Sequence, residues 1–221
     1  MNLMKALPDI TFWFRNPKQI ISDSWSERNV ILESDVNLFS WKRKTNQQIS
    51  SYLQHVVSSD KEPISFFTDV NDLEKWISEI RGIWDGENKT AGDAFWKDVF
   101  IVVRDFLTFS PSQSGTVILK VIHSNQCTKF HTDGYPLRLF TTYYGKGTEW
   151  LPEKALNRGA LGKRNDQIVK NPFKIQRMET FEVGILKGEL SDRMNPTPGI
   201  VHRSPEIEKT GEKRIILRVD I

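Results

Sequence analysis

The pattern of apolar residues changes near Pro111, and this change most constrains how the chain can fold. Before it, apolar side chains recur at helical spacing in three segments: 45–57, 71–84 and 91–109. After it, short runs of β-branched and aromatic residues alternate with glycines and prolines, which is typical of strands and turns. The sequence therefore predicts an α+β protein, mainly helical over residues 1–110 and β-rich over residues 111–221.

The helical segments carry apolar faces suited to a core. Asn71 and Glu74 have the spacing of a capping box, which predicts that a helix begins there. Aromatic residues follow at helical spacing, and residues in that pattern are far more often core than a ligand cage. We therefore expect these helices to pack outside a sheet.

Five segments of the second half are expected to be strands: 117–122, 138–144, 181–186, 199–203 and 214–221. The last one alternates, so that Ile215, Leu217 and Val219 face one way while Arg214 and its neighbours at even positions face the other. Between the strands, residues 150–172 form a long polar connection, and connections of this kind often cover a site.

Length and composition favour one globular domain spanning residues 1–221. Hydrophobic residues make up 38% and charged residues 27% of the chain, which excludes a disordered protein. The net charge is only +3 and the signs are interspersed, so a nucleic-acid partner is not indicated. Composition defines neither the substrate nor the oligomeric state.

The cysteine content and the apolar runs bear on location. Cys127 is the single cysteine, so no intrachain disulfide can form, which favours a reducing compartment. Residues 1–14 lack the pattern of a secretion signal, and no run approaches the roughly 18 apolar residues that a membrane span needs. We expect a cytoplasmic protein without a membrane partner.

The triplet His131-Thr132-Asp133 is the first candidate for chemistry. Residues two apart on a strand point to the same side, so His131 and Asp133 project together if the segment is extended. Imidazole and carboxylate suit a divalent first-row metal ion. The triplet alone is more typical of a turn, with Asp133 and Gly134 forming an Asx-type turn.

Two later residues add to this pattern. His202 lies in a short apolar segment bounded by prolines, and Arg214 follows 12 positions later at the start of the last strand. Strand, loop and strand would bring an arginine beside the second histidine. An arginine fork can hold a carboxylate through two hydrogen bonds.

The order H-x-D, then His, then Arg resembles the Fe(II)/2-oxoglutarate-dependent oxygenase superfamily over roughly residues 115–221. The resemblance implies a double-stranded β-helix (a jelly-roll or cupin-like core) with the N-terminal helices outside it. It implies that His131, Asp133 and His202 bind Fe(II). It also implies that Arg214 binds the distal carboxylate of the cosubstrate 2-oxoglutarate, with Arg218 as its substitute.

Other residues of the same region could line such a site. Thr142, Tyr143, Tyr144 and Arg138 lie on one expected strand, and Tyr143 is our candidate for contact with the cosubstrate. Each of them is also an ordinary strand residue.

A narrower resemblance covers most of the chain. The stretch from Phe130 to Pro152 is similar to a bacterial family, the domain of unknown function 1826. That family brings no established substrate with it. Besides the oxygenase, two hypotheses stay open: a cupin-like metal-binding protein without oxygenase activity, and an interaction module that is not an enzyme.

Overall fold

The computed structural model describes residues 16–59, 61–85, 92–189 and 197–221. Its main element is a seven-stranded sheet made of β1 (Lys18–Ser22), β2 (Val36–Trp41), β3 (Ile64–Asp69), β4 (Ser114–Ile122), β5 (Leu137–Tyr144), β8 (Val183–Lys187) and β10 (Arg214–Asp220). Their order in the sheet is β1-β2-β8-β5-β10-β4-β3. All neighbours are antiparallel except β1 and β2, which are parallel.

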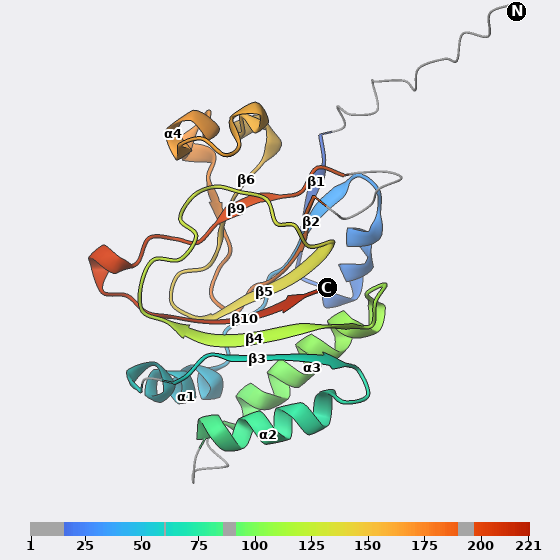
Figure 1. Ribbon diagram of the computed structural model, residues 1–221, viewed down its shortest axis with the longest axis vertical. Helices are drawn as coiled ribbons and strands as arrows, with labels where there is room; N and C mark the ends of the chain where they lie inside the picture. The colour runs from blue at the N-terminus through green and yellow to red at the C-terminus, as the bar shows by residue number, and fades with distance from the viewer. Residues whose placement is uncertain (1–15, 60, 86–91, 190–196) are drawn as a thin grey trace, which may run out of the picture.

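A second, smaller sheet lies on the other side of β5 and β8 from the helices (Figure 1). It consists of β6 (Glu149–Leu151), β7 (Gln176–Arg177) and β9 (Val201–Arg203), in the order β7-β6-β9. The described residues thus form a mixed α/β structure with a large, mostly antiparallel sheet.

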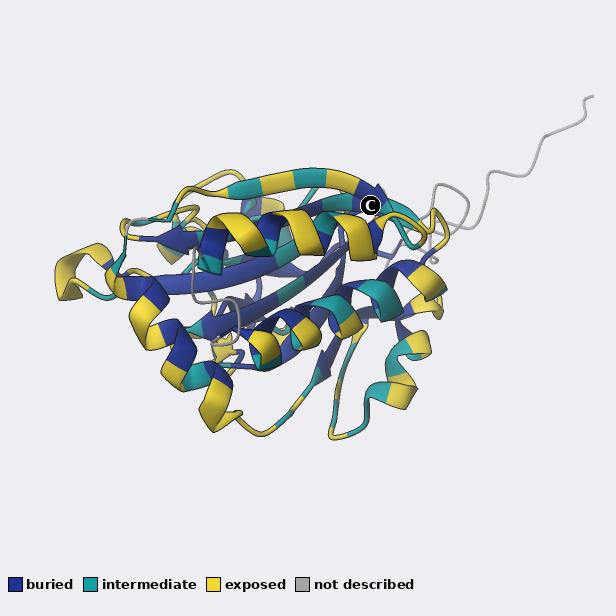
Figure 2. Cartoon of the chain, turned by 90° about the horizontal axis from the view of Figure 1, so that it is seen from below, coloured by how far each residue is buried: buried dark blue, intermediate teal, exposed yellow. Residues whose placement is uncertain are grey.

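Three long helices cover one face of the large sheet (Figures 1 and 2). They are α1 (Gln47–Ser58), α2 (Leu73–Asp85) and α3 (Asp93–Phe109). Their buried faces join the strands in one apolar core. Shorter elements complete the chain: α4 (Asn165–Ile168) and the 3-10 helices η2 (Trp25–Leu32), η3 (Glu153–Ala155), η4 (Arg158–Ala160), η5 (Pro172–Lys174) and η6 (Glu208–Thr210).

Strand β10 shows how the sheet separates two environments. Ile215, Leu217 and Val219 are fully buried in the core shared with the helices. Arg214 and Arg218 lie on the opposite face, where they line a cavity. The alternation read from the sequence is therefore confirmed, because successive side chains of a strand point to opposite faces.

The N-terminal half is less helical than the sequence indicated. It supplies β1 and β2 at one edge of the large sheet and β3 at the other. Five of the six residues of β2 are buried, since the strand is covered on both faces. A strand covered in this way lacks the alternation that identifies a half-exposed strand.

Two local expectations are also wrong in detail. The second helix begins at Leu73, and Asp69 rather than Asn71 supplies the side-chain acceptor at its start, for the backbone N–H groups of Asn71 and Asp72. The connection over residues 150–172 is not an open loop. It begins with β6, contains η3, η4 and α4, and buries a small apolar cluster of its own.

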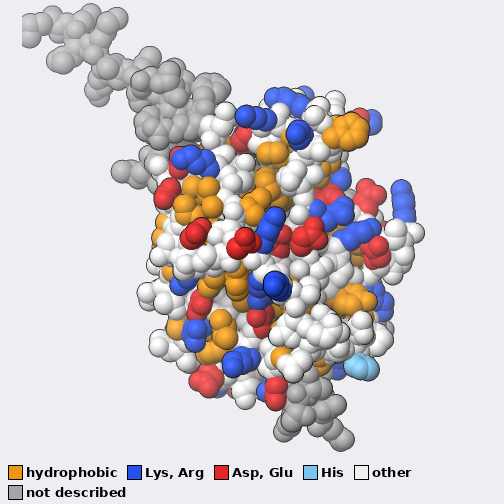
Figure 3. Space-filling model, turned by 180° about the vertical axis from the view of Figure 1, so that it is seen from behind, with side chains coloured by type: hydrophobic (Ala, Val, Ile, Leu, Met, Phe, Trp, Pro, Cys, Tyr) orange, Lys and Arg blue, Asp and Glu red, His pale blue; other side chains and the backbone are white. Residues whose placement is uncertain are grey.

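Surface charge and helix composition are relevant to nucleic-acid and membrane partners. On the face shown in Figure 3, basic and acidic side chains are intermixed. Among the described helices, none combines the length and the apolar character that crossing a bilayer would take. The expectation about a secretion signal concerns residues 1–14, which lie outside the described residues.

Candidate functional site

Backbone pairing brings the two predicted histidines together across 71 positions of sequence. His131 and His202 form an isolated β-bridge, in which each N–H donates to the other's carbonyl oxygen at 3.0 and 2.9 Å. The two rings lie on one side of this bridge with centroids 4.7 Å apart. His202 belongs to β9, whereas His131 lies in the segment between β4 and β5, where it is a single bridge residue rather than part of a regular strand.

Asp133 completes the cluster. One of its carboxylate oxygens, Oδ2, lies 3.4 Å from Nε2 of His202, and the other, Oδ1, lies 3.7 Å from Nε2 of His131. One ligand atom from each residue falls within 4.8 Å of the other two. The three predicted metal ligands therefore converge, and all three belong to the face of the sheet away from the helices.

The hydrogen bonds around the histidines suit metal binding. Nδ1 of His131 lies 2.8 Å from the carbonyl oxygen of Lys129, and Nδ1 of His202 lies 3.2 Å from that of Ile200. These contacts favour a proton on Nδ1 in both rings, which leaves the lone pair of Nε2 directed at the cluster. Burial lowers the pKa of His202 to about 4, although Asp133 opposes this shift, so its ring is neutral at pH 7.

One carboxylate oxygen of Asp133 has an unusual environment. Its Oδ2 atom is buried and accepts no hydrogen bond from the described residues. A buried carboxylate oxygen without a donor is costly unless a cation binds it. Two neutral imidazoles and one carboxylate with open positions are the ligand set of non-heme Fe(II) sites, so these residues fit a ferrous ion.

Arg138 on β5 holds the other oxygen of that carboxylate. Its Nη1 lies 2.5 Å from Asp133 Oδ1, and its Nε donates to Asp220 on β10. Asp220 also accepts from Arg218, with Nη2 and Oδ2 3.0 Å apart. Arg138 thereby links the Asp133 carboxylate to Asp220 on β10.

A cavity of about 90 Å³ opens beside the histidines. Its lining includes Arg214, which is 2% exposed. The guanidinium donates through Nε to the carbonyl oxygen of Lys146 at 2.6 Å and contacts Oγ1 of Thr142 at 3.3 Å. Burial lowers its pKa to about 10, with Glu149 acting in the opposite direction.

Arg214 and Arg218 differ in their anionic partners. No carboxylate of the described residues forms an ion pair with Arg214, whereas Arg218 pairs with Asp220. Glu149 is engaged elsewhere, by Arg177 and Arg203. A buried arginine without a carboxylate is suited to bind one from a ligand, and this favours Arg214 over Arg218.

The structure does not bring Tyr143 to this cavity. Its ring lies in the core on the helix side, and its hydroxyl donates to Asp98 of α3 at 2.6 Å. The register between β5 and β10 shifts beside it, so that Thr142 pairs with Ile216 and Tyr144 with Ile215. Alternation along β5 places Tyr143 on the face opposite Arg138, and the irregularity turns Tyr144 to the helix side as well. Tyr143 therefore lies away from the cavity, which corrects our assignment of this residue.

Lys120 was not anticipated. It lies on β4, directly across from Ile216 of β10, and its side chain lines the cavity. A signal existed in the sequence, because Lys120 is the charged residue in the otherwise apolar run 117–122. Burial lowers its pKa, and Arg218 and Arg214 act in the same direction.

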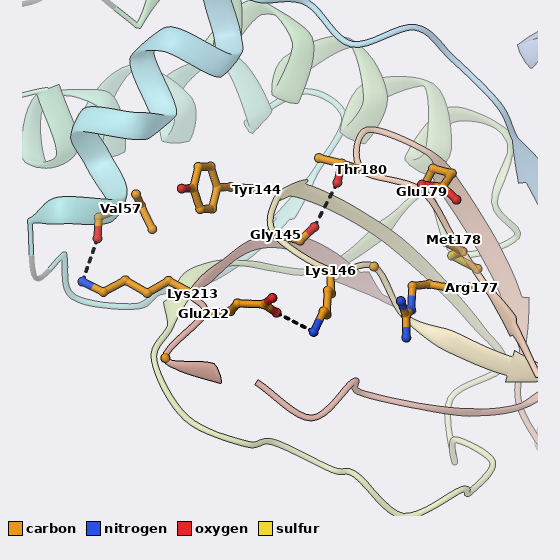
Figure 4. A pocket seen from close by; sticks show the side chains of 12 residues that line it. Val57, Tyr144, Gly145, Lys146, Arg177, Met178, Glu179, Thr180, Glu212 and Lys213 are labelled. Atoms are coloured by element: carbon orange, nitrogen blue, oxygen red, sulfur yellow. Dashed lines mark hydrogen bonds and ion pairs between the residues drawn. The ribbon is translucent and has the colours of Figure 1, made fainter. Parts of the chain in front are cut away.

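A larger hollow, of about 580 Å³, lies at the end of β5 (Figure 4). Tyr144, Lys146, Glu212 and Lys213 contribute to its lining, and Lys146 pairs with Glu212 at 2.8 Å. It lacks the histidines and the candidate metal ligands. We therefore take the smaller cavity, beside the candidate metal ligands, as the candidate functional site.

Known structures share this architecture. The dioxygenase for auxin oxidation 1 from Arabidopsis thaliana, solved as a complex with 2-oxoglutarate, superposes with a TM-score of 0.51 at 8% identity. The match covers 92% of this chain and 91% of that one. A dioxygenase for auxin oxidation from rice gives 0.47 at 10% identity, covering 83% and 72%. The fold is thus similar to that of 2-oxoglutarate-dependent dioxygenases, as the sequence motifs indicated.

The sequence itself defines the family. Residues 22–220 match the family described as protein of unknown function DUF1826, and the chain belongs to it. No curated protein of known function matches the sequence. Activity and substrate must therefore be argued from the site.

Proposed function

We propose that this protein is an Fe(II)/2-oxoglutarate-dependent oxygenase. The observation that carries the proposal is a three-ligand cluster, His131, Asp133 and His202, beside a cavity with a buried arginine. That arginine, Arg214, has no carboxylate partner among the described residues. The cluster suits a ferrous ion, and Arg214 suits a carboxylate of the cosubstrate. The similarity of fold to a dioxygenase bound to 2-oxoglutarate agrees with this assignment.

We also propose that the two sheets together are a double-stranded β-helix. Strand β9 of the small sheet supplies His202, and β5 and β10 of the large sheet supply Arg138 and Arg214. The cluster and the cavity lie between these strands, as expected for ligands bound inside a jelly-roll core. In this arrangement the N-terminal helices close the outer face of the large sheet.

Each residue then has a defined task. The histidines would bind the metal through Nε2 and Asp133 through Oδ2, while Arg138 keeps Oδ1 of Asp133 in place. Arg214 would bind the distal carboxylate of 2-oxoglutarate, oriented by its contacts with Thr142 and Lys146. Fe(II) with 2-oxoglutarate and oxygen supplies the oxidation of a substrate C–H bond.

Apolar side chains form part of the cavity wall. Phe140 packs its ring against His202 with centroids 5.8 Å apart, and Ile122 and Ile216 are buried at the other wall. A cavity that excludes water strengthens the attraction between Arg214 and a carboxylate. These residues therefore favour tight binding of a small anionic cosubstrate.

Thermal unfolding tests the cosubstrate assignment. We expect 2-oxoglutarate to raise the midpoint of the Mn(II)-loaded protein, since a ligand of the folded state stabilises it. Arg214→Met should weaken 2-oxoglutarate binding by about 100-fold, because a buried charge-assisted pair is lost, and leave Mn(II) affinity unchanged. Arg164→Met, on an exposed arginine that pairs with Asp166 outside the cavity, is the control.

Two outcomes would select the other hypotheses. Metal binding without any effect of 2-oxoglutarate would indicate a cupin-like metal-binding protein. Absence of metal binding after anaerobic reconstitution would favour an interaction module. A cytoplasmic location and the absence of a membrane or nucleic-acid partner are part of the proposal and rest on sequence alone.

A further inference from the structure

The cavity contains more positive charge than metal and cosubstrate need. Four cationic side chains line it: Lys120, Arg138, Arg214 and Arg218. Two carboxylates neutralise part of this charge, Asp133 and Asp220, and both are buried. A ferrous ion and dianionic 2-oxoglutarate cancel each other, so the site would keep two positive charges.

The geometry assigns this excess to two residues. Arg138 is held between Asp133 and Asp220, and Arg214 is assigned to the cosubstrate. Lys120 contacts only a neutral group among the described residues, Oε1 of Gln126 at 3.3 Å. Arg218 shares Asp220 with Arg138, and its Nε is buried without an acceptor. These donors remain available for a ligand.

Lys120 and Arg218 are also close enough to act together. Lys120 is directly opposite Ile216 in the antiparallel pair β4–β10, and Arg218 is two residues further along β10 on the same face. Diagonal neighbours of this kind are about 7–8 Å apart at Cα, within reach of long side chains. Repulsion between the two cations would be relieved by an anion bound between them.

We propose that Lys120 and Arg218 bind an anionic group, a carboxylate or a phosphate, of a small-molecule substrate. The proposal rests on the proposed function, because the reaction defines what else occupies the cavity. Strands of both sheets line the cavity, so its walls enclose the two cations, which suits a small acid rather than a macromolecule. On the face shown in Figure 3, basic and acidic side chains are intermixed rather than arranged as a basic track for a nucleic acid.

Calorimetric titration of the protein loaded with Mn(II) and saturated with 2-oxoglutarate tests this site. Acetate and methyl phosphate are the two anionic probes, and acetamide is the neutral probe of similar shape. We expect at least one anion to bind about tenfold more tightly than acetamide, and the stronger anion indicates the substrate group. Lys120→Met should remove this preference, Lys120→Arg should keep it, and Lys75→Met, on the exposed face of α2, should not change it.

The outcomes separate two failures. If 2-oxoglutarate does not bind the metal-loaded protein, the proposed function fails and this inference fails with it. If 2-oxoglutarate binds but both anions bind no better than acetamide, only the inference is overturned. It is also overturned if Lys120→Met leaves anion affinity unchanged, or weakens 2-oxoglutarate as strongly as it weakens the anions.

Discussion

The two faces of the large sheet are built by the same strands but carry opposite chemistry. On the helix side, Leu217 and Val219 of β10 are fully buried among apolar residues. On the other side, Arg214 and Arg218 of the same strand line a cavity next to two histidines and a carboxylate. One face stabilises the fold, and the other holds buried charges and the candidate metal ligands.

This difference between the two faces predicts which substitutions change stability and which change ligand binding. Apolar burial contributes about 25 cal/mol per Å² and needs no partner. A buried charge costs free energy unless an opposite charge satisfies it. Substitutions on the helix face should therefore affect unfolding, whereas those on the cavity face should affect ligands.

The largest effect is expected for Asp133→Ala. It removes one of three ligands and the buried oxygen that has no other partner, so metal affinity should fall by more than about 100-fold. Equilibrium binding of Mn(II) or Co(II) measures this. Asp166→Ala, on the exposed start of α4, is the matched control. Unchanged metal affinity in Asp133→Ala would place the metal site elsewhere.

Leu217→Ala should reduce the stability of the fold rather than metal binding. Leu217 is 0% exposed in the helix-side core, and its truncation should cost about 2–5 kcal/mol of unfolding free energy. Denaturant titration measures this loss. Metal affinity at low denaturant should stay within about twofold of the unsubstituted protein. A large loss of metal affinity would show that the two faces are not independent.

Arg138→Met tests the charge that supports the metal ligand. The substitution frees Oδ1 of Asp133, so metal affinity should fall by about 10–100-fold, as for other partners of metal ligands. The absorption bands of bound Co(II) should also change, because Asp133 can then bind through both oxygens. Unfolding can shift as well, but loss of stability with unchanged Co(II) bands would reduce Arg138 to a structural role.

The smallest effect is expected for Tyr143→Phe. It removes a buried hydrogen bond to Asp98 on the helix side, which should cost about 1–2 kcal/mol of unfolding free energy. Affinity for 2-oxoglutarate should not change, because the ring lies across the sheet from the cavity. Weaker 2-oxoglutarate binding with unchanged stability would restore Tyr143 as a cosubstrate contact.

The sequence contained much of the site because its residues have distinctive chemistry at fixed spacing. His131, Asp133, His202 and Arg214 could be selected without coordinates. The structure brings the first three together beside a cavity that Arg214 lines. Alternation along β10 also placed the arginines correctly on one face. Period-two patterning is a strong signal wherever one face of a strand is apolar and the other is not.

Other features depend on long-range pairing that no local pattern encodes. The irregularity between β5 and β10 turns Tyr144 to the helix side, and it results from the register with Ile215 and Ile216. Strand β2 is buried on both faces, which removes its alternation. Lys120 becomes part of the site only because β4 pairs with β10.

Anaerobic titration with Fe(II), with and without 2-oxoglutarate, tests the central claim most directly. When 2-oxoglutarate binds a ferrous ion through two oxygens, a visible metal-to-ligand absorption band forms. We expect this band to appear only with both components, to saturate at one equivalent of Fe(II), and to be absent in His202→Ala. Fe(II) binding without the band at saturating 2-oxoglutarate would contradict the assignment of this site to a 2-oxoglutarate-dependent oxygenase.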